Sequence, residues 1–134
     1  MAEETVKYLE TKLQGIRRVG LIATTGTVQA GIFHRFFSKI GKELILPPPE
    51  VQGKRVMKAI YGKKGIKAIG PTDNSKRLIL QACQTLIRRG AQAIIAGCTE
   101  VPLALQEGDL PVPVIDPLSI LAQSAIAMAR GKRR

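Results

Sequence analysis

The segment Gly97-Cys98-Thr99-Glu100 holds a cysteine that could move protons or act as a nucleophile in this chain of 134 residues. It stands between an apolar run and a stretch of helical spacing, so we expect Cys98 at the start of a helix. A helix N-terminus favours thiolate over thiol, which would lower the pKa of Cys98. Cysteine is also among the most buried residue types, so a purely structural role is the alternative.

A second segment, Ala23-Thr24-Thr25-Gly26-Thr27-Val28, places three threonines around a glycine where another apolar run ends. Threonine hydroxyls and the free backbone N–H groups of a helix start can bind an anion. The G-x-G-x-x-G and Gly-Lys-Ser/Thr patterns that hold nucleotide phosphates are missing, so a carboxylate fits better. The alternative is that Thr25 or Thr27 only caps a helix.

The other cysteine and the histidine do not suggest a second site. Cys83 lies on the apolar stripe of a helical stretch, so we assign it to the core. His34 has no partner at the spacing of a metal site or a catalytic triad, and no Cys or His pair has zinc-ligand spacing. We therefore predict no metal site.

The elements that position these segments follow from the alternation of apolar runs with stretches of helical period. Strands are expected at 18–24, 43–46, 91–96 and 111–115. Helices are expected at 2–14, 28–40, 51–61, 75–89, from about 101 to 106, and at 117–130, with a glycine-rich loop at 62–71.

This order predicts one α/β domain over residues 1–134. We expect a four-stranded parallel sheet flanked by helices on both faces, a Rossmann-like three-layer sandwich. Ligands bind beyond the carboxyl ends of the strands in such sheets, so the site is expected at the loops that carry Thr24–Thr27 and Cys98.

Charge and composition narrow the range of partners. The chain has 21 Lys and Arg against 10 Asp and Glu, a net charge of +11, but the basic residues are scattered. Trp is absent and there are 2 Tyr, so the stacking surface typical of nucleic-acid binding is missing and we do not expect such a partner. An anionic small-molecule ligand explains the net positive charge equally well.

No apolar run approaches the ~20 residues of a membrane span, and the acidic N-terminus does not resemble a secretory signal, so we expect a cytoplasmic protein.

Several runs resemble one family in the same order along the chain. They are Ile94–Leu103, which contains Cys98, and residues 19–27, 59–67, 89–91 and 113–117. They resemble the aspartate/glutamate racemases, which need no pyridoxal phosphate or other cofactor. The resemblance implies that two cysteines exchange a proton at the α-carbon of aspartate or a related acidic amino acid or dicarboxylate, one as thiolate and one as thiol.

The resemblance also implies roles for individual residues. Cys98 would be one of the two cysteine bases. Thr24, Thr25, Gly26 and Thr27 would hold a substrate carboxylate, Lys67 would meet the side-chain carboxylate, and Thr99 and Glu100 would line the site.

The chain resembles only the second of the two similar halves that make up members of this family. Each half of such a protein supplies one cysteine, and the strand that ends in Cys-Asn in the first half has no counterpart here. Cys83 cannot replace it because it lies within a helix. We therefore expect a first half or a second copy to complete the site. A homodimer would form through the cleft loops, through the apolar stripe of the last helix, or through both; the stripe consists of Leu118, Leu121, Ala122, Ala125, Ile126 and Ala129. The alternative function is a non-catalytic carboxylate-binding domain.

Overall fold

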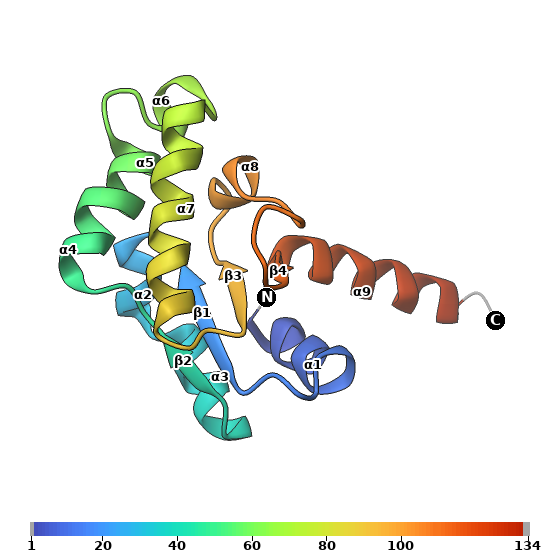
Figure 1. The fold of residues 1–134 in the computed structure, drawn as a ribbon. Helices are drawn as coiled ribbons and strands as arrows, with labels where there is room; N and C mark the ends of the chain where they lie inside the picture. Colours follow the sequence, from blue (N-terminus) through green and yellow to red (C-terminus); the bar gives the residue numbers. More distant parts are fainter. Residues whose placement is uncertain (1, 133–134) are drawn as a thin grey trace.

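The computed structural model describes residues 2–132, in which four strands form a parallel sheet. The strands are β1 (Arg18–Ile22), β2 (Glu43–Ile45), β3 (Ala93–Ala96) and β4 (Val114–Ile115). They lie in the order β2-β1-β3-β4, so β1 and β3 occupy the centre (Figure 1). The predicted four-stranded parallel sheet is confirmed, with strands shorter than the apolar runs.

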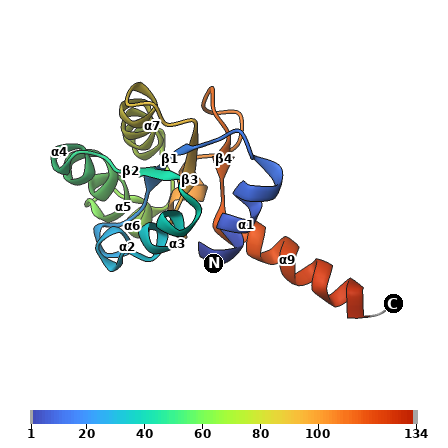
Figure 2. The ribbon, with the colours of Figure 1, turned by 90° about the horizontal axis from the view of Figure 1, so that it is seen from below.

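Helices cover both faces of the sheet, as predicted (Figure 2). One face packs against α7 (Asp73–Arg88) and the helical segment made of α4 (Pro49–Val51), η1 (Gln52–Met57) and α5 (Lys58–Tyr61), with α8 (Val101–Ala104) beside them. The other face packs against α1 (Ala2–Lys12) and α3 (Ile32–Ile40). The remaining helices among the described residues are α2 (Thr25–Ala30), α6 (Ile66–Ile69) and α9 (Pro117–Lys132).

The two central strands are buried on both faces because successive side chains point in opposite directions. Leu21 of β1 and Ile95 of β3 belong to the core under α1 and α3. Ile22 and Ile94 belong to the core under α7. Cys83 of α7 is fully buried in that second core, which confirms its structural assignment.

The helices depart from prediction where local capping decides their ends. The predicted helix 28–40 is two helices, α2 and α3, because Gly31 takes a left-handed conformation with φ of 71° and ends α2. The predicted loop 62–71 contains α6. The predicted helix 75–89 begins at Asp73, because Thr72 and Ser75 form a reciprocal capping box.

Residues 49–61 form one continuous helical segment that begins two residues earlier than predicted. Pro48 precedes it and Pro49 occupies its first turn, where a missing N–H is harmless. Its middle six residues, Gln52–Met57, are wound as a π-helix. Single π turns of this kind are rare and often lie at functional sites.

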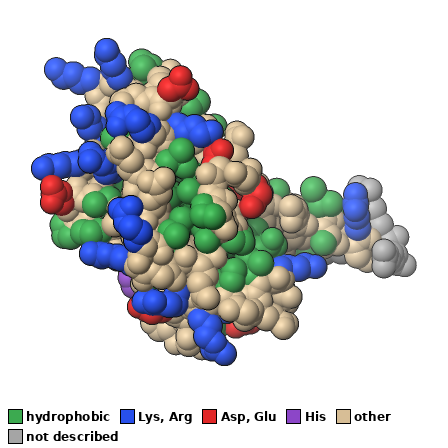
Figure 3. Space-filling view, in the orientation of Figure 1, with side chains coloured by type: hydrophobic (Ala, Val, Ile, Leu, Met, Phe, Trp, Pro, Cys, Tyr) green, Lys and Arg blue, Asp and Glu red, His purple; other side chains and the backbone are tan. Residues whose placement is uncertain are grey.

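Helix α9 begins at the sheet and projects away from the body of the molecule (Figures 1 and 2). Its first half packs against α1, and Ser124 Oγ donates to Glu4 Oε2 at 2.9 Å. Large apolar side chains along it are exposed, including Leu121 at 40%, Ile126 at 52% and Met128 at 63%. Figure 3 shows hydrophobic side chains on the surface of this projecting helix. Within residues 2–132 no helix is both long and apolar enough to cross a membrane.

Candidate functional site

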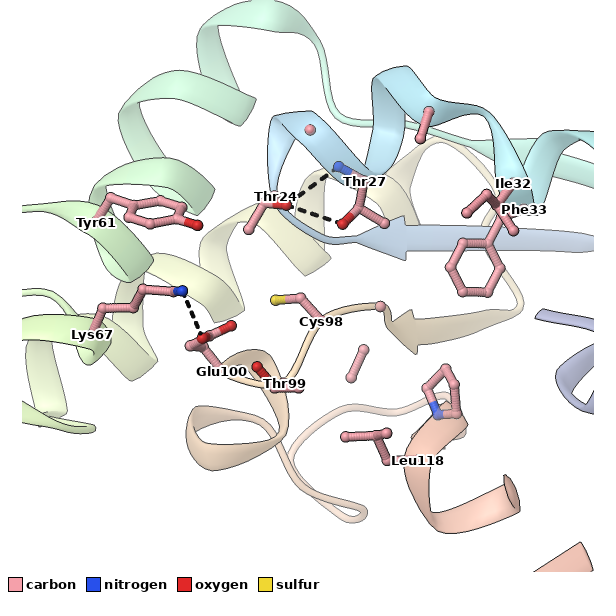
Figure 4. Close-up of a pocket in the computed structure, with 15 residues that line it drawn as sticks. Thr24, Thr27, Ile32, Phe33, Tyr61, Lys67, Cys98, Thr99, Glu100 and Leu118 are labelled. Carbon is pink, nitrogen blue, oxygen red and sulfur yellow. Dashed lines mark hydrogen bonds and ion pairs between the residues drawn. The ribbon is translucent and has the colours of Figure 1, made fainter. Parts of the chain in front are cut away.

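A cavity of about 580 Å³ opens beyond the carboxyl ends of β1 and β3 (Figure 4). This is the edge of the sheet at which the sequence predicted a ligand site. Seven of the eight predicted site residues line the cavity, namely Thr24, Gly26, Thr27, Lys67, Cys98, Thr99 and Glu100. Their roles stay predictions, but the fold brings together residues that lie up to 76 positions apart in the chain.

Cys98 lies two residues after Ala96, the last residue of β3, and the intervening Gly97 determines how close this segment lies to β1. The Gly97 N–H donates to the carbonyl of Ile22 at 2.8 Å, which extends the pairing of the two central strands by one residue. A Cβ at position 97 would lie 2.6 Å from Leu21 Cδ1 and 3.0 Å from the Ala23 Cβ. Only glycine therefore allows this close approach, which carries Cys98 into the cavity.

The environment of Cys98 raises its pKa, contrary to the predicted lowering. Burial is the largest cause, and the Glu100 carboxylate adds to it, while the backbone N–H groups of Val101 and Glu100 act in the opposite direction. The predicted helix is only the four residues of α8, too short for a strong dipole. Cys98 is therefore a thiol at neutral pH in the ligand-free protein.

Glu100 and Lys67 form an ion pair at the wall of the cavity, with 3.2 Å between Lys67 Nζ and Glu100 Oε1. Burial alone would raise the pKa of Glu100, but hydrogen bonds with Thr99 and Lys67 outweigh it and the pKa is lowered. The bond to Glu100 raises the pKa of Lys67, and the Lys67 ammonium lies 5.1 Å from the centre of the Tyr61 ring. Both groups of the pair are therefore charged at neutral pH.

Thr24 and Thr27 form the opposite wall. Their hydroxyl oxygens lie 3.0 Å apart, and Thr24 Oγ1 also accepts a hydrogen bond from the Thr27 N–H at 3.3 Å. Thr24 is thus the N-cap of α2, rather than Thr25 or Thr27 as the alternative interpretation of the sequence supposed. Figure 4 shows the Cys98 sulfur between this threonine pair and the Lys67–Glu100 pair.

Thr25 is the predicted site residue that does not line the cavity. Its N–H donates to the sulfur of Met57 at 3.3 Å, and its hydroxyl oxygen accepts from Gln52 Nε2 at 3.4 Å. Its side chain is therefore directed at η1. The N–H groups of Thr25 and Thr27 are both occupied within the protein, so neither of them is available to the anion expected at this helix start.

Several cavity residues were missed from the sequence. Tyr61 ends α5, is 53% exposed, and points into the cavity from the same side as Lys67 (Figure 4). Ile32 and Phe33 enter from the start of α3, and Pro117 and Leu118 from the start of α9. These apolar residues share no spacing that marks a site, although Tyr61 precedes the glycine-rich segment that holds Lys67. The described part of the chain contains no cluster of His, Cys, Asp or Glu that could hold a metal ion.

The chain is similar in sequence to one protein family. A family model described as Asp/Glu/hydantoin racemase matches residues 1–125. An uncharacterized protein in the pnlA 3′ region of Pectobacterium carotovorum subsp. carotovorum is 31% identical over 109 residues, which cover 78% of this chain and 69% of that protein.

Solved structures extend this similarity to the fold. A candidate Asp/Glu racemase from Yersinia pestis is 30% identical, with a TM-score of 0.83, and the match covers 96% of this chain and 54% of that chain. An aspartate racemase homologue from Pyrococcus horikoshii OT3 is 23% identical, with a TM-score of 0.77 and the same two coverages, which supports the fold alone. The chain therefore spans about half the length of the solved structures that it matches.

Proposed function

Because the chain belongs to the Asp/Glu/hydantoin racemase family, we propose that it supplies half of a racemase site for an acidic amino acid. Cys98 is the group that moves the α-proton. The observation that carries this proposal is the position of the Cys98 sulfur in the cavity, between hydroxyl donors on one side and a charged pair on the other.

The cavity suits aspartate or a related dicarboxylate. One hydroxyl proton of the Thr24–Thr27 pair is used in their mutual hydrogen bond, and the other hydroxyl can donate to one ligand carboxylate. The Lys67 ammonium can meet a second carboxylate across the cavity. Lys67 is already paired with Glu100, so a ligand carboxylate must share or displace that partner. This competition favours a doubly charged ligand over a neutral amino acid such as alanine.

The protonation state of Cys98 suggests which of the two roles it takes, proton donor or proton acceptor. A racemase needs one thiolate to break the Cα–H bond and one thiol to protonate the opposite face, while the electron pair rests in the α-carboxylate as an enolate. Burial and Glu100 keep Cys98 in the thiol form, so in its resting state it is suited to donate the proton. The base for that direction must face it from across the cavity.

A second copy of the chain is the simplest source of that base, provided that its Cys98 first loses its proton to solvent and becomes the thiolate. Cys83 is buried outside the cavity, so Cys98 is the cysteine that one copy contributes to it. Exposed apolar side chains surround the mouth, with Ile32 at 41% and Leu118 at 42%, and continue along α9. We propose a symmetric homodimer in which these surfaces meet and the two Cys98 sulfurs flank one α-carbon.

Exchange of the α-proton of aspartate with deuterated water tests the proposal. Exchange requires one working base, whereas racemisation requires both cysteines on opposite faces. We expect exchange that rises with pH through pH 9, because the raised pKa of Cys98 means that the thiolate forms only at high pH. Cys98→Ser should abolish it, and Cys83→Ser is the matched control outside the cavity. Binding of aspartate without exchange by the wild-type protein would favour the non-catalytic carboxylate-binding domain.

Racemisation and assembly are separate measurements. Sedimentation velocity at micromolar concentration should show a dimer, and circular dichroism should show loss of optical activity from L-aspartate. A stable monomer that exchanges the α-proton would refute the homodimer while leaving the role of Cys98 intact.

A further inference from the structure

The π-helical turn η1 contacts the threonine loop through two side chains at its ends. Gln52 Nε2 donates to the carbonyl of Ala23 at 2.8 Å and to Thr25 Oγ1 at 3.4 Å. Met57 Sδ accepts the Thr25 N–H at 3.3 Å. Neither Gln52 nor Met57 lines the cavity, so they act on it only through the loop.

The π winding is what allows both contacts. Five residues of an α-helix advance by about 140° around the axis, so Gln52 and Met57 would face different directions in an α-helix. In a π-helix the hydrogen bonds join residue i to residue i+5, which brings these two residues to the same side. The π-helical winding thus allows Gln52 and Met57 to contact the same loop at the edge of the cavity.

The position of the Gln52 side chain against the threonine loop includes one energetically unfavourable feature. Its Oε1 is buried, and no hydrogen-bond partner for this oxygen exists among residues 2–132. The amide cannot be reversed to satisfy it, because the oxygen would then face the carbonyl of Ala23. An unsatisfied buried acceptor is unfavourable, so the two donor contacts to the loop must outweigh it.

We propose that Gln52 and Met57 are positioning residues that hold the Thr24–Thr27 loop in the conformation that binds a carboxylate. Gln52 fixes the carbonyl of Ala23 and orients the Thr25 hydroxyl, and Met57 holds the Thr25 N–H. Thr24 and Thr27 then reach the cavity already bonded to each other. This inference rests on the proposed function, since it assumes that the loop binds the substrate carboxylate.

We call Gln52 and Met57 together the clamp. Gln52→Met and Met57→Leu test the proposal, because each substitution is near-isosteric and removes the contacts that one of these two side chains makes with the loop. Gln81→Met is the matched control: the Gln81 Oε1 is also buried and has no hydrogen-bond partner among the described residues, but Gln81 lies on α7 and outside the cavity. The probes are L-aspartate and malate, measured by calorimetry on the full chain. Amide hydrogen exchange at Thr25 and Thr27 and the melting temperature are recorded without ligand.

Each clamp variant should weaken dicarboxylate binding about three- to tenfold, the factor that one neutral hydrogen bond contributes to an equilibrium constant. Amide exchange at Thr25 should accelerate by a similar factor, whereas Gln81→Met should change neither. In α-proton exchange the KM for aspartate should rise by a larger factor than kcat falls, because Gln52 and Met57 act on the binding of the carboxylate.

The outcomes separate the two proposals. If the wild type binds aspartate and both clamp variants bind it equally well with unchanged Thr25 exchange, the positioning role is refuted and the proposed function survives. If the variants only lower the melting temperature, their role is structural and the inference is also refuted. If the wild type binds neither aspartate nor malate, the proposed function fails, and the positioning role fails with it.

Discussion

Selective modification of the two thiols tests the structure of the site directly. An aromatic disulfide reagent at pH 8 reacts with thiolate, so its rate with each cysteine depends on that cysteine's pKa and accessibility. Burial raises the pKa of Cys83 from its ordinary 9.0 to about 12. Cys98 lines the cavity and is half-buried, and its pKa is raised by burial and by Glu100.

The magnitude follows from the thiolate populations. At pH 8 about one Cys83 in 10⁴ is ionised, against about one in ten for a thiol of pKa 9.0, a difference of about a thousandfold. The greater nucleophilicity of a more basic thiolate restores a factor of about 20 over three pKa units. Together these two effects lower the reaction rate of Cys83 by about 50-fold relative to an ordinary thiol. The complete burial of Cys83 lowers the rate further, because the reagent cannot reach the sulfur.

We expect Cys98 to react at least about tenfold faster than Cys83 and to account for the first equivalent of reagent. Its rate should keep rising from pH 7 to pH 9, because a pKa above the ordinary value leaves the thiolate fraction growing throughout this window. Release of the chromophore gives the rates, peptide mapping by mass spectrometry assigns them, and Cys98→Ser and Cys83→Ser isolate each thiol. Equal labelling of the two cysteines, or a plateau for Cys98 below pH 8, would refute this account of the site.

Three further changes have expected outcomes. Glu100→Gln removes the carboxylate that raises the pKa of Cys98, so the pH profile of Cys98 labelling should move to lower pH; an unchanged profile would show that Glu100 does not act on the sulfur. Gly97→Ala forces a Cβ to within 2.6 Å of a core side chain and should lower the free energy of unfolding by about 1–3 kcal/mol in urea titrations, whereas Gly53→Ala, with open space around it, should not destabilise. Ile126→Asp on the exposed face of α9 should shift sedimentation from dimer to monomer, and a dimer that persists would exclude that face from the interface.

The sheet and the site edge could be predicted because they depend on periodicity. Apolar runs such as residues 91–96 must be buried, and parallel connection brings the ends of the first and third strands to one edge whatever the loops do. The sequence therefore predicts that Thr24, Thr27 and Cys98 lie at this edge of the sheet, and all three line the cavity. Lys67 was placed there by resemblance, and α6 is the local structure that carries it.

The errors come from interactions between residues distant in sequence or from backbone conformations that composition does not determine. Gly31 could have continued a helix, and only its positive φ separates α2 from α3. The pKa of Cys98 was predicted to fall because a helix was expected after it, but burial and Glu100 decide the direction. Thr25 was placed in the site, yet its partners Gln52 and Met57 lie 27 and 32 residues away and belong to a π turn that no spacing predicted.

Helix α9 has a thermodynamic consequence of its own. An isolated helix of about 16 residues is marginal in water, because nucleation is unfavourable and each further residue adds little. Residues 125–131 are exposed on all sides, so their helical hydrogen bonds receive almost no support from tertiary packing. The helical content of this arm should therefore depend on protein concentration: in dilute solution its distal turns fray, and when a partner covers the apolar stripe they become ordered. Association and the last step of folding are then one equilibrium, so the dissociation constant includes the entropy of ordering these turns.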